Sequence, residues 1–103
     1  MKNILLISLP AVATKMLVKR VGEASAKQGD DIKITTLAES EGFERMDEFD
    51  ATLLSPHLRF HVGKYGRLDD KPNMRVGIID SVTYGNLDGE AVLETISQLL
   101  LFP

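Results

Sequence analysis

The run Ile4-Leu5-Leu6-Ile7 is apolar at every position. A β-strand points successive side chains to opposite faces, so a strand of this composition is buried on both of its faces. Such strands are typical of parallel sheets that carry helices above and below. The run therefore predicts a three-layer α/β sandwich with this strand inside a parallel sheet.

Three further β-rich runs follow, and helical or turn-rich stretches separate them. They are residues 32–37, 51–54 and 75–79. This alternation is the pattern of a parallel sheet with crossover helices. Four strands joined by right-handed crossovers most simply take the order 2-1-3-4. Residues 32–37 alternate in polarity, as an edge strand does, and we predict one domain over residues 1–103.

Apolar residues at helical spacing predict the first and the last helix. The first helix follows Pro10, and its stripe comprises Ala13, Met16, Leu17, Val21 and Ala24. Gly29 is expected to end this helix, because glycine readily adopts the left-handed conformation. The last helix is expected to start at Asp88 or Gly89, and its apolar face comprises Val92, Leu93, Ile96, Leu99 and Leu100.

The segments between these elements are shorter. Residues 38–49 hold five acidic side chains and predict a short helix and loop, with Phe43 and Met46 as inward anchors. Their acidic face is either solvated or a docking surface for a basic partner. Ser55-Pro56 predicts the start of a helix whose stripe comprises Leu58, Val62 and Tyr65. Residues 71–73 are expected to form a connector and residues 80–89 a polar loop.

The composition excludes several classes of function. The chain contains no cysteine, which excludes a disulfide scaffold, a thiolate zinc site and thiol catalysis. A net charge of -3 offers no broad cationic field for a nucleic acid. No apolar run approaches the length of about 20 residues that crosses a bilayer, so we expect no membrane insertion and a cytoplasmic location.

A ligand crevice is expected where the chain reverses direction between the first and third strands. There Ser8–Thr14 and Ser55–His57 should face each other above the carboxyl ends of the strands. The first of these loops reads Ser8-Leu9-Pro10-Ala11-Val12-Ala13-Thr14. Backbone N–H groups at the following helix start could cradle a phosphate. However, the loop has no glycine and Pro10 lacks an N–H, so a simple tight turn is the alternative.

Four other polar residues fall near this crevice: Ser55, His57, Asp80 and Tyr84. His57 either contacts or accepts a phosphate or is a solvated loop histidine. His57 and His61 have the spacing of a two-histidine metal pair on a helix, but no third ligand accompanies them, so no metal site is predicted. Tyr84 either reaches the crevice or packs its loop against the sheet.

Two segments resemble a known protein family. Residues 78–89 read Ile-Ile-Asp-Ser-Val-Thr-Tyr-Gly-Asn-Leu-Asp-Gly and are similar to that family's I-D-x-x-x-Y-G-x-x-D-G segment. Residues 52–57 resemble its third strand and turn, which usually ends L-L-G-P-Q, with Ser55 for the glycine and His57 for the glutamine. The whole chain resembles the enzyme IIB subunit of the lactose/cellobiose class of the bacterial phosphoenolpyruvate:sugar phosphotransferase system.

The resemblance implies a phosphocarrier subunit that needs no cofactor and works with a IIA subunit and a membrane IIC subunit. In that family a cysteine at the end of the first strand takes a phosphoryl group from a IIA histidine and hands it to the sugar in IIC. Here Ser8 stands in place of the cysteine and Ala11 in place of a glycine, while Thr14 keeps its hydroxyl. A serine is a weak nucleophile without a base. The alternative is a non-catalytic interaction or regulatory module that binds IIA or IIC without relaying phosphate.

Overall fold

A computed structural model describes residues 2–8, 12–61 and 75–101 of the chain. At its centre is a four-stranded sheet in the order β2-β1-β3-β4, and each pair of neighbours is parallel. The strands are β1 (Lys2–Ile7), β2 (Ile32–Leu37), β3 (Ala51–Leu54) and β4 (Val76–Ile78). The predicted parallel sheet, its strand order and the edge position of residues 32–37 are confirmed.

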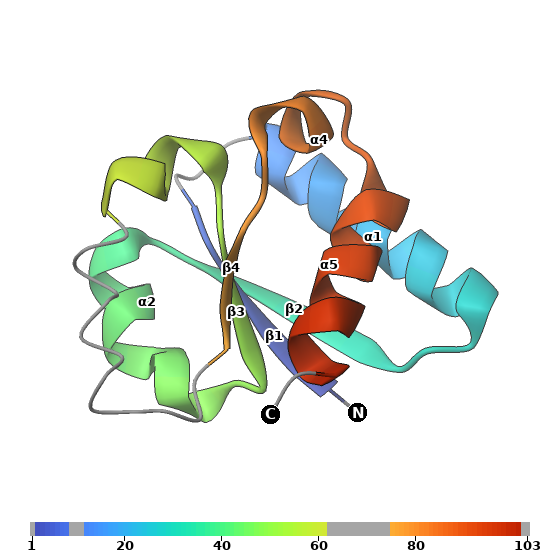
Figure 1. Ribbon diagram of the computed structural model, residues 1–103, viewed down its shortest axis with the longest axis horizontal. Helices are drawn as coiled ribbons and strands as arrows, with labels where there is room; N and C mark the ends of the chain where they lie inside the picture. The colour runs from blue at the N-terminus through green and yellow to red at the C-terminus, as the bar shows by residue number, and fades with distance from the viewer. Residues whose placement is uncertain (1, 9–11, 62–74, 102–103) are drawn as a thin grey trace.

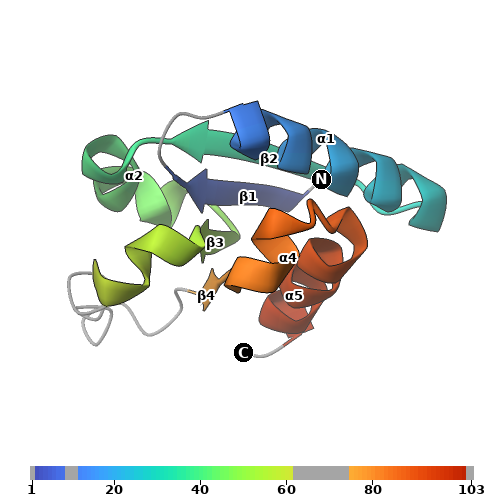
Figure 2. The same cartoon turned by 90° about the horizontal axis from the view of Figure 1, so that it is seen from above.

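Helices cover both faces of the sheet, which gives the predicted three layers (Figures 1 and 2). One face carries α1 (Val12–Gln28) and α5 (Gly89–Leu101). The other carries α2 (Glu39–Arg45) and the 3₁₀ helices η1 (Met46–Glu48) and η2 (Pro56–His61). A short helix, α4 (Ser81–Gly85), lies beside the start of α1 at the carboxyl end of the strands (Figure 1).

The side chains of β1 supply both halves of the core, as its apolar run predicts. Ile4 and Leu6 belong to the cluster under α1 and α5. Leu5 and Ile7 belong to the opposite cluster, which includes Met46 of η1. All four side chains of the run are at most 2% exposed. Burial on both faces follows from the alternation of side chains along a strand.

The buried stripe of α1 is narrower than the sequence predicts. Leu17, Val21 and Ala24 are buried, but Met16 is 44% exposed, so its prediction as a core residue is wrong. Met16 lies on the same side of α1 as Arg20, Glu23 and Lys27, which follow it at helical spacing and are exposed. Gly29 follows the helix with φ of 74°, which confirms the predicted glycine end.

The two helices on this face approach closely at Gly89, the first residue of α5. A Cβ atom on Gly89 would lie 2.4 Å from the carbonyl carbon of Arg20 in α1. Only a residue without a side chain permits this approach of two backbones. Because α5 begins at Gly89, the predicted start of the last helix is correct. The helix runs back along the sheet, so the end of α5 and the start of β1 lie at the same end of the molecule, away from α4 (Figure 1).

The connecting segments differ more from expectation. Met46 is buried as predicted, but Phe43 is 42% exposed, and Gly42 is the buried residue of α2. A Cβ atom there would meet Ile7 Cγ1 at 2.7 Å, so glycine lets α2 lie against β1. The helix expected after Ser55-Pro56 is the 3₁₀ helix η2, and it buries Leu58. The rest of its predicted stripe, Val62 and Tyr65, and the connector at residues 71–73 lie outside the described residues.

Candidate functional site

The carboxyl ends of the four strands lie in one row, and backbone hydrogen bonds continue the row beyond the strands. Ser8 N–H donates to Leu37 O at 3.1 Å, and Ser55 N–H donates to Ile7 O at 3.1 Å. These bonds place Ser8 and Ser55, which follow β1 and β3, side by side at the predicted switch point.

Three hydroxyl groups are linked at this edge. Ser8 Oγ lies 3.1 Å from Thr14 Oγ1, and Thr14 Oγ1 lies 2.7 Å from Tyr84 OH. Ser8 and Thr14 are 5% and 4% exposed. The Ser8 and Thr14 side chains are therefore packed inside the edge, and their hydroxyls satisfy each other as buried polar groups must.

Tyr84 reaches this position because residues 81–85 form a helix, α4, where a loop was expected. Asp80 is its N-cap: Oδ1 accepts from Thr83 N–H at 2.8 Å and Oδ2 accepts from Thr83 Oγ1 at 2.9 Å. A helix this short depends on such a cap, because its first N–H groups have no partner within the helix. Some of the polar residues and one of the glycines that suggest a loop belong to this capped helix.

The cap also changes the acidity of Asp80. The hydrogen bond from the Thr83 backbone and then that from the Thr83 hydroxyl stabilise the carboxylate, and together they lower the pKa of Asp80 from its ordinary value of 3.8. Asp80 was predicted as a crevice residue. Its described contacts assign it to the helix that carries Tyr84.

His57 lies on the exposed side of the same group. Its Nε2 is 2.9 Å from Ser55 Oγ, and Ser55 is fully buried. Its ring meets the Tyr84 ring edge to face, with centroids 6.2 Å apart and planes at 83°. This geometry is a favourable arrangement for two aromatic rings.

The contacts described above form a closed series. Ser8 touches Thr14, Thr14 touches Tyr84, Tyr84 touches His57, His57 touches Ser55, and Ser55 is bonded to the residue before Ser8. We name these five residues the contact ring. It joins the ends of β1 and β3 to α1, α4 and η2, and it contains four of the predicted site residues of the crevice together with Thr14 from the predicted loop: Ser8, Thr14, Ser55, His57 and Tyr84.

The remaining loop predictions divide into two groups. Leu9, Pro10 and Ala11 lie outside the described residues. Val12 and Ala13 belong to the first turn of α1, as expected for a helix that follows Pro10. The first-turn N–H groups of a helix carry its positive dipole end, and in α1 they lie next to Thr14.

The four-residue spacing of His57 and His61 predicts a shared face only on an α-helix. Both residues fall in η2, a 3₁₀ helix, in which residues three apart rather than four apart lie above one another. Within residues 2–8, 12–61 and 75–101, the structure groups no three histidine, cysteine or acidic side chains that could hold a metal ion. None of the helices in these ranges is long and apolar enough to span a membrane.

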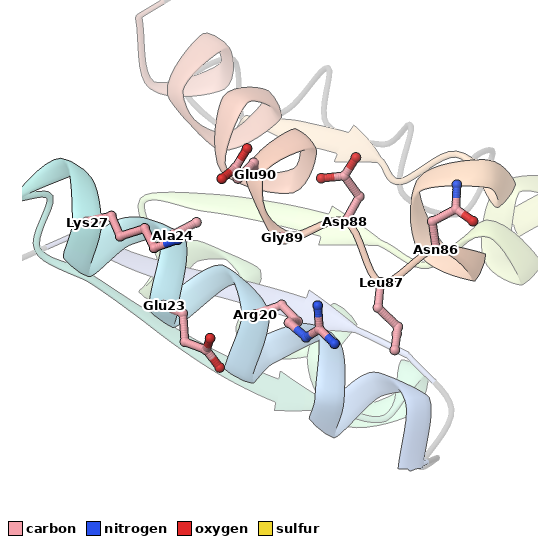
Figure 3. Close-up of a pocket in the computed structure, with 9 residues that line it drawn as sticks. All are labelled: Arg20, Glu23, Ala24, Lys27, Asn86, Leu87, Asp88, Gly89 and Glu90. Carbon is pink, nitrogen blue, oxygen red and sulfur yellow. The ribbon is translucent and has the colours of Figure 1, made fainter.

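An open cavity of about 320 Å³ lies elsewhere, between α1 and the start of α5 (Figure 3). It is lined by Arg20, Glu23, Ala24, Lys27, Asn86, Leu87, Asp88, Gly89 and Glu90. Its charged side chains are of both signs and none belongs to the contact ring. We therefore place the candidate site at the contact ring, where buried hydroxyls and an imidazole converge, and not in this cavity.

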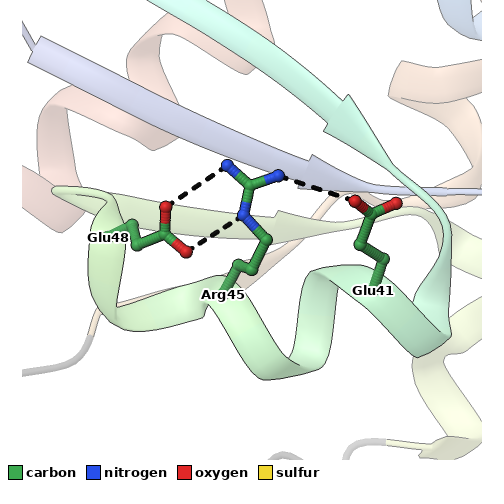
Figure 4. A network of polar contacts seen from close by, with 3 residues as sticks. All are labelled: Glu41, Arg45 and Glu48. Atoms are coloured by element: carbon green, nitrogen blue, oxygen red, sulfur yellow. Dashed lines mark hydrogen bonds and ion pairs between the residues drawn. The ribbon is translucent and has the colours of Figure 1, made fainter.

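The acidic segment forms its own exposed network. Arg45 lies 3.0 Å from Glu48 and 3.6 Å from Glu41 (Figure 4). The hydrogen bond with Glu48 and then its charge raise the pKa of Arg45. These side chains are in solvent, where ion pairs contribute little stability. The network does not distinguish the two interpretations of this acidic surface.

The sequence contains weak signs of the bond between Thr14 and Tyr84. The two residues are 70 positions apart, so local spacing does not relate them. The one local sign is Asp80, because aspartate is a preferred N-cap residue and here precedes the helix that carries Tyr84.

Comparison with known proteins shows what this arrangement is similar to. The oligo-β-mannoside-specific EIIB component of a phosphotransferase system from Bacillus subtilis is 29% identical over 101 residues, which cover 98% of each chain. The solution structure of a cellobiose-specific phosphotransferase IIB component from Borrelia burgdorferi matches with a TM-score of 0.79 at 29% identity, over 96% of this chain and 91% of that one. The chain is therefore similar to IIB components over nearly its whole length.

The likeness of fold extends to a structure of lower sequence identity. The lactose-specific IIB domain from Streptococcus pneumoniae has a TM-score of 0.79 with this chain at 12% identity, over 94% of this chain and 95% of that one. No protein-family model matches the chain. The predicted resemblance to IIB components of the lactose/cellobiose class is thus confirmed, and the contact ring lies at the carboxyl edge of a IIB-type sheet.

Proposed function

We propose that this chain works in the cytoplasm, as a IIB-type component of a lactose/cellobiose-class sugar phosphotransferase system. In this proposal it binds a IIA partner and a membrane IIC partner through the face that carries the contact ring. Ser8, at the position of the family's cysteine, does not carry the phosphoryl group.

The observation behind the last point is the environment of Ser8 Oγ. The side chain is 5% exposed and its oxygen lies 3.1 Å from the Thr14 hydroxyl. Thr14 in turn is bonded to the Tyr84 hydroxyl. A hydroxyl needs a base to become a good nucleophile, and neither threonine nor tyrosine is a base at neutral pH. This arrangement supports a structural role for Ser8.

The chemistry of a phosphorylated serine also argues against Ser8 as the carrier. A cysteine thiolate is a nucleophile, and its phosphate keeps enough transfer potential to reach a sugar. A phosphoserine is an ordinary phosphate ester and a poor onward donor. Partner binding does not need this chemistry, because the surface around a IIB-type fold can be retained while the acceptor is lost.

The test begins with binding. Purified protein is titrated with the IIA protein that partners a related IIB component, and binding is followed by calorimetry and by NMR shifts. We expect saturable binding with the largest shifts at the carboxyl edge, around Ser55 and Tyr84. Absence of binding to every IIA tried, or shifts confined to the acidic helix α2, would contradict the proposal.

The second part follows phosphate. The protein is incubated with phosphoenolpyruvate, the general phosphotransferase proteins and the IIA partner, and then analysed by intact mass and peptide mapping. We expect no phosphoryl group on Ser8. Stoichiometric label on Ser8 that chases onto sugar in IIC-containing membranes would show that the serine is a carrier after all.

A further inference from the structure

The contact ring contains a second nucleophile besides Ser8, and it is better placed. His57 is exposed, whereas Ser8 is 5% exposed. A phosphoryl donor on another protein must bring its phosphorus directly onto the attacking atom. As an exposed residue, His57 offers such a donor better access than the buried Ser8 does.

The imidazole is also held in place from two sides. Ser55 Oγ contacts Nε2 at 2.9 Å, and Ser55 is fully buried at the end of β3. The Tyr84 ring packs against the imidazole at 83°, and Tyr84 is fixed by its bond to Thr14. A solvated loop histidine needs neither contact. An acceptor benefits from both, because a fixed ring reaches the reacting geometry without a further loss of conformational freedom.

An imidazole has the chemistry that the Ser8 hydroxyl lacks. A neutral histidine has a lone pair on one ring nitrogen near neutral pH and needs no base to attack phosphorus. The first turn of α1 adds the positive end of a helix dipole at the same edge, which favours an incoming anion. The contact ring thus offers an exposed nucleophile, His57, beside a helix end that favours negative charge.

We propose that His57 is the phosphoryl acceptor of this site. The inference rests on the proposed function in one respect: the donor is taken to be a phosphohistidine on a partner protein. When Nε2–H donates to Ser55 Oγ, the lone pair of the ring is on Nδ1, which attacks the phosphorus. A new N–P bond forms on His57, the donor's N–P bond breaks, and its electron pair stays on the donor's nitrogen.

The protons balance through solvent. The phosphorylated ring releases the proton from Nε2, and the donor's ring takes one up. After this release Nε2 accepts a hydrogen bond, and the Ser55 hydroxyl can donate it, because a hydroxyl is both donor and acceptor. Ser55 therefore holds the ring before and after transfer. Its role is that of a positioning residue.

The test uses two donors and the chain's own second histidine as a control. The full-length protein is treated either with phosphoramidate, a small-molecule phosphoryl donor, or with the phosphorylated IIA protein. Label is located by peptide mapping under alkaline conditions, and its acid lability separates phosphohistidine from phosphoserine. The variants are His57→Gln, His61→Gln and Ser8→Ala, and thermal unfolding checks that each is folded.

We expect one acid-labile phosphoryl group per chain, on His57. His57→Gln should lose it, while His61→Gln should keep it. In Ser8→Ala the label that forms should still map to His57. Ser55→Ala should lower the labelling rate about 10-fold, with the same final site, as for a positioning residue. Label on Ser8, on His61 or on neither histidine with both donors would overturn the inference.

The two proposals fail in different ways. Binding of IIA without label on His57 would overturn the acceptor and leave the IIB-type partnership standing. Phosphoramidate label on His57 without any IIA binding would support the acceptor and contradict the partnership.

Discussion

The hydroxyl of Tyr84 lies 2.7 Å from Thr14 Oγ1 and so joins α4 to the first turn of α1 across 70 residues of sequence. The same tyrosine ring contacts His57 beyond β3. One side chain therefore connects the segments that follow β1, β3 and β4. The position of the imidazole and the burial of the Thr14 hydroxyl both depend on this residue.

Tyr84→Phe removes the hydroxyl and keeps the ring. We expect the free energy of unfolding to fall by about 1–3 kcal/mol, because the buried Thr14 hydroxyl loses this partner. The edge-to-face contact with His57 should persist. Urea denaturation monitored by circular dichroism measures the loss, and an unchanged midpoint would show that the bond contributes nothing.

Ser8→Cys should not by itself create a phosphate carrier. The new thiol would take the buried position of Ser8, which a phosphoryl group on another protein reaches less easily than an exposed side chain. The loop would still lack the N–H of Pro10, and one missing anion donor typically costs about 10²–10³ in rate. Label on residue 8 is the readout. The double variant with Ala11→Gly should accept more label than Ser8→Cys, and equal, stoichiometric label on both would refute this reasoning.

Gly89→Ala should destabilise the fold because its Cβ would lie 2.4 Å from the backbone of Arg20. Two helix backbones must separate to admit it, and overpacking of this kind typically costs about 1–3 kcal/mol or more. Gly22→Ala is the matched control: nothing lies within 4 Å of its Cβ, and it should stabilise α1 by about 0.5–1 kcal/mol. Thermal unfolding compares the two. A loss of stability in both variants would assign the effect to something other than helix approach.

Asp80 should make part of the stability depend on pH. Its folded pKa is lowered below the ordinary value of 3.8, so its contribution is fully present above the unfolded pKa and is lost as pH falls through the folded pKa. Asp80→Asn keeps a capping oxygen and removes the titration. Its melting temperature should therefore fall less steeply than that of the wild type between about pH 5 and pH 2. Parallel curves for the two proteins would contradict the role of the carboxylate.

The regular elements of this fold could be predicted because local patterns determine them. The fully apolar run of β1 requires two covered faces, and the structure covers both. The alternating polarity of residues 32–37 indicates one strand neighbour, and β2 is at the edge. In each case one strand's own residues carry the information.

The predictions that were wrong concern residues whose positions are set by contacts with another element of the fold. Phe43 is apolar, but the close approach of α2 to β1 at Gly42 turns the phenylalanine toward solvent. The Asp80 side chain converts an expected loop into α4, and this turn then aims Tyr84 at Thr14. The predicted strand order was enough to place Ser8 and Ser55 beside each other at the carboxyl ends of β1 and β3. The contact ring did not follow from the strand order, because its links join residues that no repeat or spacing relates.

The route of α5 back along the sheet has a practical consequence. The start of β1 and the end of α5 lie at one end of the molecule, whereas α4, which carries Tyr84 of the contact ring, lies at the other (Figure 1). An affinity tag, a fluorophore or a sensor-chip anchor attached at either terminus would therefore stand behind the face that a partner must reach. Immobilised protein should present the His57 face outward without any redesign of the chain.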